Sequence, residues 1–155
     1  MSREIKFRVW DKTSDSMLYQ DDFERVELDT KNKMVTLIAE EESDKSHYVL
    51  DYEDSIEAEI LQYTGLKDKN GKEIYEGDIL RCKCLKKCKL DSCAEKVIQY
   101  KNSLIEWWES GCNLGYRLRD SKGKTMMIKP THLNTMEVEV IGNIYENPEL
   151  LEGER

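Results

Sequence analysis

The sequence predicts a mainly β protein, built from short antiparallel strands with little helix. Turn-forming residues recur roughly every ten positions, which is typical of small antiparallel folds. No segment keeps the 3.6-residue apolar period of a long amphipathic helix. We expect an N-terminal β element over residues 1–60 and a β core over residues 61–155, with a cysteine-rich insertion at 82–95 and a C-terminal tail. The pattern over residues 61–145 is compatible with a small SH3-like barrel.

The first 60 residues are expected to form the N-terminal element. Residues 6–10 place Phe7 and Val9 on one face of a short strand, because side chains alternate along a strand. The acidic run 40–42 is expected to be an exposed loop, and residues 54–60 fit one helical turn as well as a strand. The other strands of this element are predicted at residues 17–19, 23–28, 34–38 and 47–52.

Two turn signals define a hairpin over residues 61–80. Asn70-Gly71 tolerates positive φ at both central positions of a type I′ turn, so the chain can reverse tightly there. Glu76-Gly77-Asp78 predicts a second bend, which leads into the apolar pair Ile79-Leu80. We therefore expect a hairpin followed by a buried strand.

The rest of the chain is expected to continue as hairpins. Lys101-Asn102-Ser103 lies between two apolar segments and predicts a reversal. Gly142, within a strand at 137–144, predicts a β-bulge or a close backbone approach. Asn147-Pro148 would end that strand, and Leu150-Leu151 would dock the tail on the core. Further strands are predicted at residues 80–84, 95–100, 104–108, 115–119 and 126–129.

Composition limits the classes of function. The chain has 155 residues, and its net charge of −8 results from 32 acidic and 24 basic side chains. Such a chain does not attract nucleic acid as a whole, so the balance disfavours a nucleic-acid partner. The segment 81–96 differs, with six basic residues against two acidic ones. No apolar run resembles a signal peptide or a membrane span, so we expect a cytoplasmic protein without a membrane partner.

Four cysteines form the most distinctive local pattern. Cys82, Cys84, Cys88 and Cys93 are spaced C-x-C-x3-C-x4-C, and four thiolates can bind zinc tetrahedrally. The C-x2-C spacing of zinc knuckles is missing, and residues two apart on a strand stand nearly ~7 Å apart, so a shared metal requires a bend. The alternative interpretation is an exposed loop with reduced thiols, which suits a reducing compartment.

Two adjacent tryptophans mark a possible interaction surface. Trp107 and Trp108 occupy neighbouring positions of a predicted strand, so only one of them can face the core. The other is expected to face outward, where it could bind a partner or pack on the N-terminal element. No nucleophile–base arrangement, glycine-rich phosphate loop or metalloprotease motif is visible, and we do not expect an enzyme. His132 is interpreted as a lone imidazole in a loop.

Three segments carry a resemblance to a known family. They are residues 3–11, the hairpin at 61–80 and the closing segment 138–151. Together they resemble the YopX family, which is found mainly in bacteriophages and prophages and whose biochemical role is not established. The resemblance implies a phage or prophage accessory protein but supplies no reaction.

Two functions from different classes remain open. The first is a non-enzymatic protein that binds another protein or itself, because short strands present edges that invite pairing. The second is a zinc-stabilised nucleic-acid module that uses the basic cysteine-rich segment. Metal content and salt-dependent binding to single strands would distinguish them.

Overall fold

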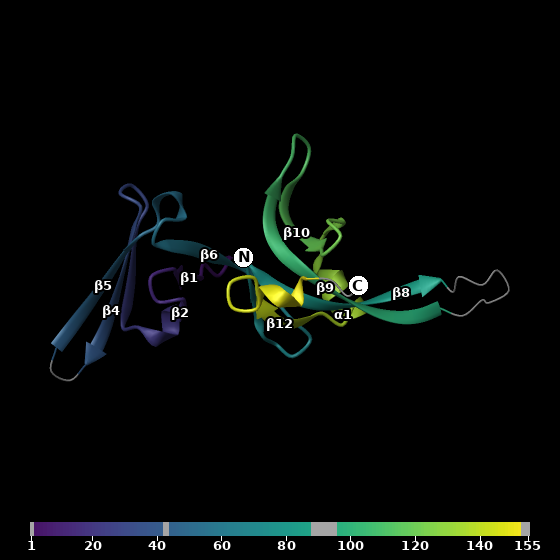
Figure 1. The fold of residues 1–155 in the computed structure, drawn as a ribbon, viewed down its shortest axis with the longest axis horizontal. Helices are drawn as coiled ribbons and strands as arrows, with labels where there is room; N and C mark the ends of the chain where they lie inside the picture. Colours follow the sequence, from purple (N-terminus) through teal and green to yellow (C-terminus); the bar gives the residue numbers. More distant parts are fainter. Residues whose placement is uncertain (1, 42–43, 88–95, 153–155) are drawn as a thin grey trace. The chain divides into compact units, whose positions relative to one another are not determined.

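Figure 1 shows a computed structural model of the chain, which describes residues 2–41, 44–87 and 96–152. The fold is mainly β and is built from antiparallel strand ladders. The chain divides into two compact units, Met1–Tyr63 and Thr64–Arg155. The division falls within strand β6, Ala58–Lys67. Within the described part, no helix has the length and apolar character needed to cross a membrane.

The first unit contains two small groups of strands. Strand β1 pairs with β2 on one side and with the start of β6 on the other, while β3, β4 and β5 form a three-stranded meander. The strands are β1 (Phe7–Asp11), β2 (Ser16–Tyr19), β3 (Arg25–Asp29), β4 (Met34–Glu41) and β5 (Asp44–Asp51). Two 3-10 turns complete the unit, η1 (Gln20–Asp22) and η2 (Glu53–Ser55).

The core of the first unit comes from both groups of strands. It contains the buried side chains of Val9, Val35, Leu37, Leu50 and Ala58. Asp11 is fully buried at the end of β1, where its carboxylate accepts hydrogen bonds from the Thr13 amide and from the Thr13 and Ser14 hydroxyls. Burial acts to raise the pKa of Asp11, but these hydrogen bonds outweigh it and hold the pKa below its ordinary value.

The second unit is built on a five-stranded sheet with the order β11-β10-β9-β8-β12. β7 pairs with β6, and one short α-helix is present among the described residues of the unit. The elements are β7 (Glu73–Tyr75), β8 (Asp78–Lys87), β9 (Lys96–Glu109), β10 (Leu114–Asp120), β11 (Thr125–Met127), α1 (Pro130–Thr135), β12 (Glu139–Asn143) and the 3-10 turn η3 (Pro148–Leu150).

The turn between β6 and β7 depends on one aspartate. Asp68 Oδ1 accepts hydrogen bonds from the amides of Asn70 and Lys72, and its Oδ2 accepts one from the Val140 amide at 3.0 Å. Gly71 has φ +80°, but Asn70 does not have a positive φ. The predicted reversal is therefore present, but the prediction of a type I′ turn is wrong, because the Asp68 side chain organises a wider loop.

Gly142 behaves as its place in the sequence predicts. The register of β12 against β8 shifts between Val140 and Gly142, which is a β-bulge. A Cβ at Gly142 would lie 2.6 Å from Asn147 Oδ1 and 2.9 Å from a methyl carbon of Leu150. The Leu150 carbonyl also accepts a hydrogen bond from the side-chain Nδ2 of Asn102 at 3.0 Å. Both the close backbone approach and the docked tail are confirmed.

Three local predictions are wrong. Residues 101–103 do not turn the chain, because each pairs with a residue of β8 inside the continuous strand β9. Glu40 and Glu41 of the acidic run lie in β4, which continues to Glu41, and not in a loop, whereas Glu42 lies outside the described residues. His132 lies in α1 rather than in a loop, and its Nδ1 accepts a hydrogen bond from the Lys129 amide. In the first two cases strand pairing overrides the local turn propensity of the sequence, and in the third a short helix forms around the histidine.

The five-stranded sheet is open rather than closed. Its outermost strands in the hydrogen-bonded order are β11 and β12, and no ladder joins them in the described part of the chain. The predicted mainly β fold is confirmed, but a closed SH3-like barrel is not shown. The ambiguous segment 54–60 resolves into the end of η2 followed by the start of β6.

Candidate interaction surface

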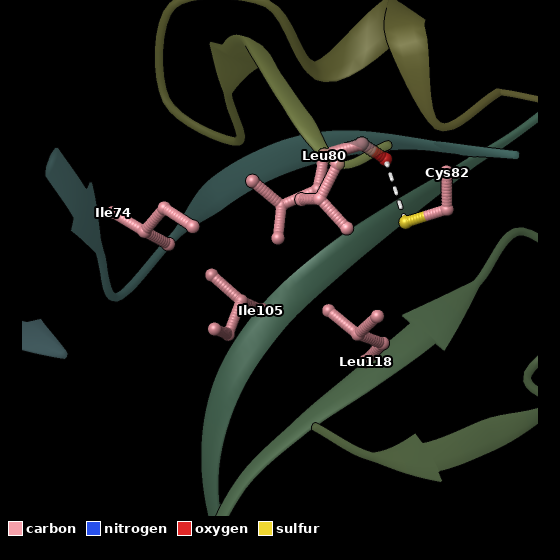
Figure 2. Close-up of a cluster of buried hydrophobic side chains, with 6 residues drawn as sticks. Ile74, Leu80, Cys82, Ile105 and Leu118 are labelled. Carbon is pink, nitrogen blue, oxygen red and sulfur yellow. Dashed lines mark hydrogen bonds between the residues drawn. The ribbon is translucent and has the colours of Figure 1, made fainter. Parts of the chain in front are cut away.

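The core of the second unit is built around the β8–β9 pair, against which side chains of β7 and β10 pack (Figure 2). Ile74, Leu80, Cys82, Ile105 and Leu118 converge there, all buried. The Cys82 thiol donates a long hydrogen bond to the Leu80 carbonyl at 3.9 Å, drawn as a dashed line. Burial raises the pKa of the Cys82 thiol to about 12, with the neighbouring Cys84 as a smaller cause. Cys82 therefore acts as a neutral apolar side chain at neutral pH.

The structure brings two of the four predicted zinc ligands together. Cys84 is half-buried, and it lines a cavity of about 150 Å³ together with Cys82, Met126 and Met136. Cys88 and Cys93 lie outside the described residues. Among the residues that are described, no three His, Cys, Asp or Glu side chains are grouped as metal ligands. Zinc binding by the four cysteines stays a prediction, which elemental analysis of reduced protein tests.

The two tryptophans lie on opposite faces of the β9–β10 hairpin, which we define as residues 103–109 and 114–120 (Figure 1). Trp107 is 49% exposed, and its ring meets that of Tyr116 edge-on with the centroids 5.1 Å apart. Trp108 is half-buried, and the Arg117 guanidinium lies 4.9 Å from its ring centroid. Neither ring is among the buried core residues of the unit.

The face of the hairpin that carries Trp107 continues the core outward. Along it, the pair Ile105–Leu118 is buried, Trp107–Tyr116 is partly exposed, and Leu114 at the tip is 64% exposed. Residues directly opposite each other in a ladder share one face, so these side chains form one apolar stripe. Leu114 was not recognised in the sequence as part of a surface, because its face depends on the strand register.

The other face of the hairpin is organised by charge. Glu106 Oε1 accepts hydrogen bonds from Arg117 Nε at 2.8 Å and from Arg119 Nε at 3.1 Å. Burial acts to raise the pKa of Glu106, but the hydrogen bonds and charges of Arg119 and Arg117 outweigh it and lower the pKa. Sequence reasoning missed this cluster, although the alternation of Arg117 and Arg119 along a strand was a usable signal.

The outer half of the β8–β9 pair is a two-stranded ribbon, which we call the arm and define as residues 81–87 and 96–102 (Figure 1). The ladder of β12 with β8 ends at Arg81, and the ladder of β10 with β9 ends at Ser103. Leu85 and Ile98 are opposite each other in the arm and are 60% and 52% exposed. The base of the arm is held by the core, since Cys82 is buried and the Lys83 amide donates a hydrogen bond to the Met136 carbonyl. Its outer part is a two-stranded ribbon, which is marginally stable alone in water, so the exposed surface at Leu85 and Ile98 is one that a partner could cover.

Comparisons with known proteins agree with this architecture. The model of the YopX protein family matches residues 6–152. The chain has an open, mainly β architecture, and the family model matches most of its length. It therefore belongs to the YopX family. Among solved structures, the chain is similar to protein EF1440 from Enterococcus faecalis, at 28% identity and a TM-score of 0.59, over 97% of this chain and 99% of that one.

The chain is also similar to YopX from Bacillus subtilis, at 23% identity and a TM-score of 0.55, over 97% of this chain and 98% of that one. At this identity the likeness concerns the fold alone. No curated protein matches the chain. The recognition made from residues 3–11, 61–80 and 138–151 is confirmed, and it leaves the biochemical role of the chain to be argued from its surfaces.

Proposed function

We propose that this YopX family protein is a non-enzymatic phage or prophage accessory protein that binds another protein through the β9–β10 hairpin. The observation that carries this proposal is the apolar stripe that runs outward from the core to Trp107 and Leu114. A few residues supply most of the binding free energy at protein interfaces, and tryptophan and tyrosine are enriched among them. The charged residues around the stripe match the polar rim of such an interface. The partner is a second copy of the chain or a different protein, and the mass of the complex distinguishes the two.

The test compares two double variants, each of which replaces two exposed apolar side chains by serine. Trp107→Ser with Leu114→Ser removes the stripe, whereas Val49→Ser with Ile56→Ser removes two exposed apolar side chains of the first unit. Light scattering over a range of concentrations measures self-association, and capture from a bacterial lysate, followed by reconstitution with the purified partner, measures binding to another protein.

We expect the hairpin variant to lose the complex and the control to keep it. Truncating a central interface residue weakens binding by about 2 kcal/mol or more, which is a loss of roughly thirty-fold. A wild-type chain that stays monomeric and captures no protein would refute the proposal, as would equal binding by both double variants. Circular dichroism confirms that both variants are folded.

A further inference from the structure

The negative net charge of the chain is confined to its first unit. Residues 1–63 contain 17 acidic and 8 basic side chains, whereas residues 64–155 contain 15 acidic and 16 basic ones. The argument from net charge against a polyanionic partner therefore applies to the first unit and not to the second. Within the second unit, the basic side chains are concentrated in one place.

That place is the arm. Its residues include six basic side chains and no aspartate or glutamate: Arg81, Lys83, Lys86, Lys87, Lys96 and Lys101. Two of these lysines have a carboxylate nearby, since Lys83 Nζ lies 3.1 Å from Glu137 and Lys101 Nζ lies 3.8 Å from Asp120. Arg81, Lys86 and Lys96 are exposed, and none of the three forms an ion pair with a described residue.

One face of the arm also carries aromatic and apolar side chains. The Arg81 guanidinium lies 4.2 Å from the ring centroid of Tyr100, which is 41% exposed. Leu85 and Ile98 are on the same face as Tyr100, because every second pair of the ladder shares a face. The pairs on this face are Arg81–Asn102, Lys83–Tyr100 and Leu85–Ile98. A concavity of about 520 Å³ opens over this face, and it is lined by Arg81, Ile98, Gln99, Tyr100, Asn102 and Ile141.

The combination of basic, aromatic and apolar side chains on the arm limits which kind of molecule can bind there. A second arm is disfavoured, because every charged side chain on it would be basic and the two arms would repel each other. A neutral apolar partner would leave the exposed cations without counter-charge. A polyanion whose repeating unit also carries a flat apolar ring satisfies both the charges and the aromatic surface, and nucleic acid is the polymer with that chemistry.

We propose that the arm binds single-stranded nucleic acid, with bases stacked on Tyr100 and its apolar neighbours and phosphates held by the surrounding cations. Single strands are favoured over a duplex because only unpaired bases can offer a ring face to Tyr100 and the adjacent guanidinium. This site is separate from the β9–β10 hairpin, so either proposal can fail without the other.

The test measures fluorescence anisotropy of a labelled oligo-dT of about 16 nucleotides, titrated with the full chain. Each phosphate contact contributes a slope of about −0.7 to log K against log salt on single strands, so three or four contacts give a slope of roughly −2 to −3. Between about 50 and 200 mM salt, affinity should thus fall by roughly sixteen-fold or more. The same titration with a duplex of equal length should show weaker binding.

Two matched pairs of variants assign the binding to the arm. The triple variant Arg81→Gln, Lys83→Gln, Lys96→Gln removes cations from the face that carries Tyr100, so it should bring the salt slope to about −0.7 or abolish binding. Its control is Arg25→Gln, Lys31→Gln, Lys33→Gln, which removes the same charges from exposed positions of the first unit. Tyr100→Leu should weaken binding by roughly five-fold or more through lost stacking, while Tyr48→Leu, at a similarly exposed tyrosine, should not.

Several outcomes would overturn the proposal. They are no binding at about 50 mM salt, equal losses in the arm and control triple variants, or an unchanged affinity in Tyr100→Leu. Polyglutamate serves as a competitor that has charge but no rings. If it displaces the oligonucleotide at equal charge concentration, the site recognises acidic protein; if a duplex binds as tightly as a single strand, the stacking assignment is wrong.

Discussion

The middle of β9 and its two ends differ sharply although they belong to one continuous strand. Ser103, Leu104 and Ile105 in the middle are at most 7% exposed, whereas Ile98 on one side and Trp107 on the other are about half exposed. Ser103 and Leu104 pair with both β8 and β10, and the Ile105 carbonyl accepts a hydrogen bond from the Gly77 amide just before β8. Each end of the strand has only one of these neighbouring strands. The difference shows that the centre of the strand belongs to the core and that its apolar ends are exposed to solvent.

The largest effect expected from this comparison concerns two isoleucines of the same strand. Ile105→Ala should lower the free energy of unfolding by about 2–5 kcal/mol, because Ile105 is fully buried in the core and its truncation leaves a cavity. Ile98→Ala should cost about 0.5 kcal/mol, as is usual for an exposed site. Urea unfolding of both variants measures the difference. Similar losses in the two variants would contradict the division of β9 into a buried centre and exposed ends.

Gly142→Ala tests whether the tail belongs to the stable centre. The new methyl group would collide with Asn147 Oδ1 and Leu150, so the bulge or the tail must move. We expect a loss of about 1–3 kcal/mol, in the range of overpacked sites. Gly71→Ala is a useful control, because nothing lies within 4 Å of a Cβ there and the cost comes only from the strained φ of +80°. If Gly142→Ala is as stable as wild type, the close approach does not constrain the tail.

Cys82 and Cys84 extend the comparison to β8 and to pH. The Cys82 thiol has a folded pKa of about 12 against an ordinary value of 9.0, so the unfolded state loses its proton first as the pH rises. The stability associated with this thiol is complete below pH 9 and is lost between pH 9 and about 12. The slope approaches about 1.4 kcal/mol per pH unit.

Urea unfolding at a series of alkaline pH values measures how the free energy of unfolding depends on pH. In Cys82→Ala, the decrease between pH 9 and about 12 that is due to this thiol should be missing. Cys84→Ala, at a half-buried thiol two pairs further out, is the matched control and should keep most of the slope, because Cys84 is only the smaller cause of the raised pKa of Cys82. Identical pH dependence in wild type and Cys82→Ala would show that the buried thiol is not linked to stability.

Local sequence signals predicted the parts of the fold in which a single residue determines the backbone conformation. Gly142 indicated the bulge and Gly77 the bend before β8, because the chain there needs a conformation or a close approach that suits glycine. The reversal at Gly71 was also predicted, although its dependence on Asp68 was not. The three segments that resemble the YopX family were sufficient for the recognition.

Features set by strand register were outside the reach of the sequence. Residues 101–103 have turn-forming side chains, yet pairing with β8 keeps them in a strand. Which of Trp107 and Trp108 is the more exposed depends on which neighbours β10 places beside them. The basic segment was visible in the sequence, but its position on an exposed ribbon with Tyr100 became evident only when β8 and β9 were paired.

The smallest expected effect concerns Glu106, the residue that follows the buried centre of β9 in the hairpin. Its pKa is lowered by Arg119 and Arg117 against the opposing effect of burial, so the unfolded state binds a proton at a higher pH than the folded state does. The stability from this cluster is present above the ordinary pKa of 4.5 and is lost as the pH falls through the folded value.

Glu106→Gln should therefore cost about 1 kcal/mol or less at neutral pH and make unfolding less sensitive to acid, as unfolding followed from pH 7 to pH 3 would show. Glu24→Gln is a control with the same substitution at an exposed carboxylate of the first unit. A loss at Glu106 as large as that of Ile105→Ala would mean that charge, and not burial, fixes the hairpin to the core. The apolar stripe would then be part of the folding core rather than a surface available for binding.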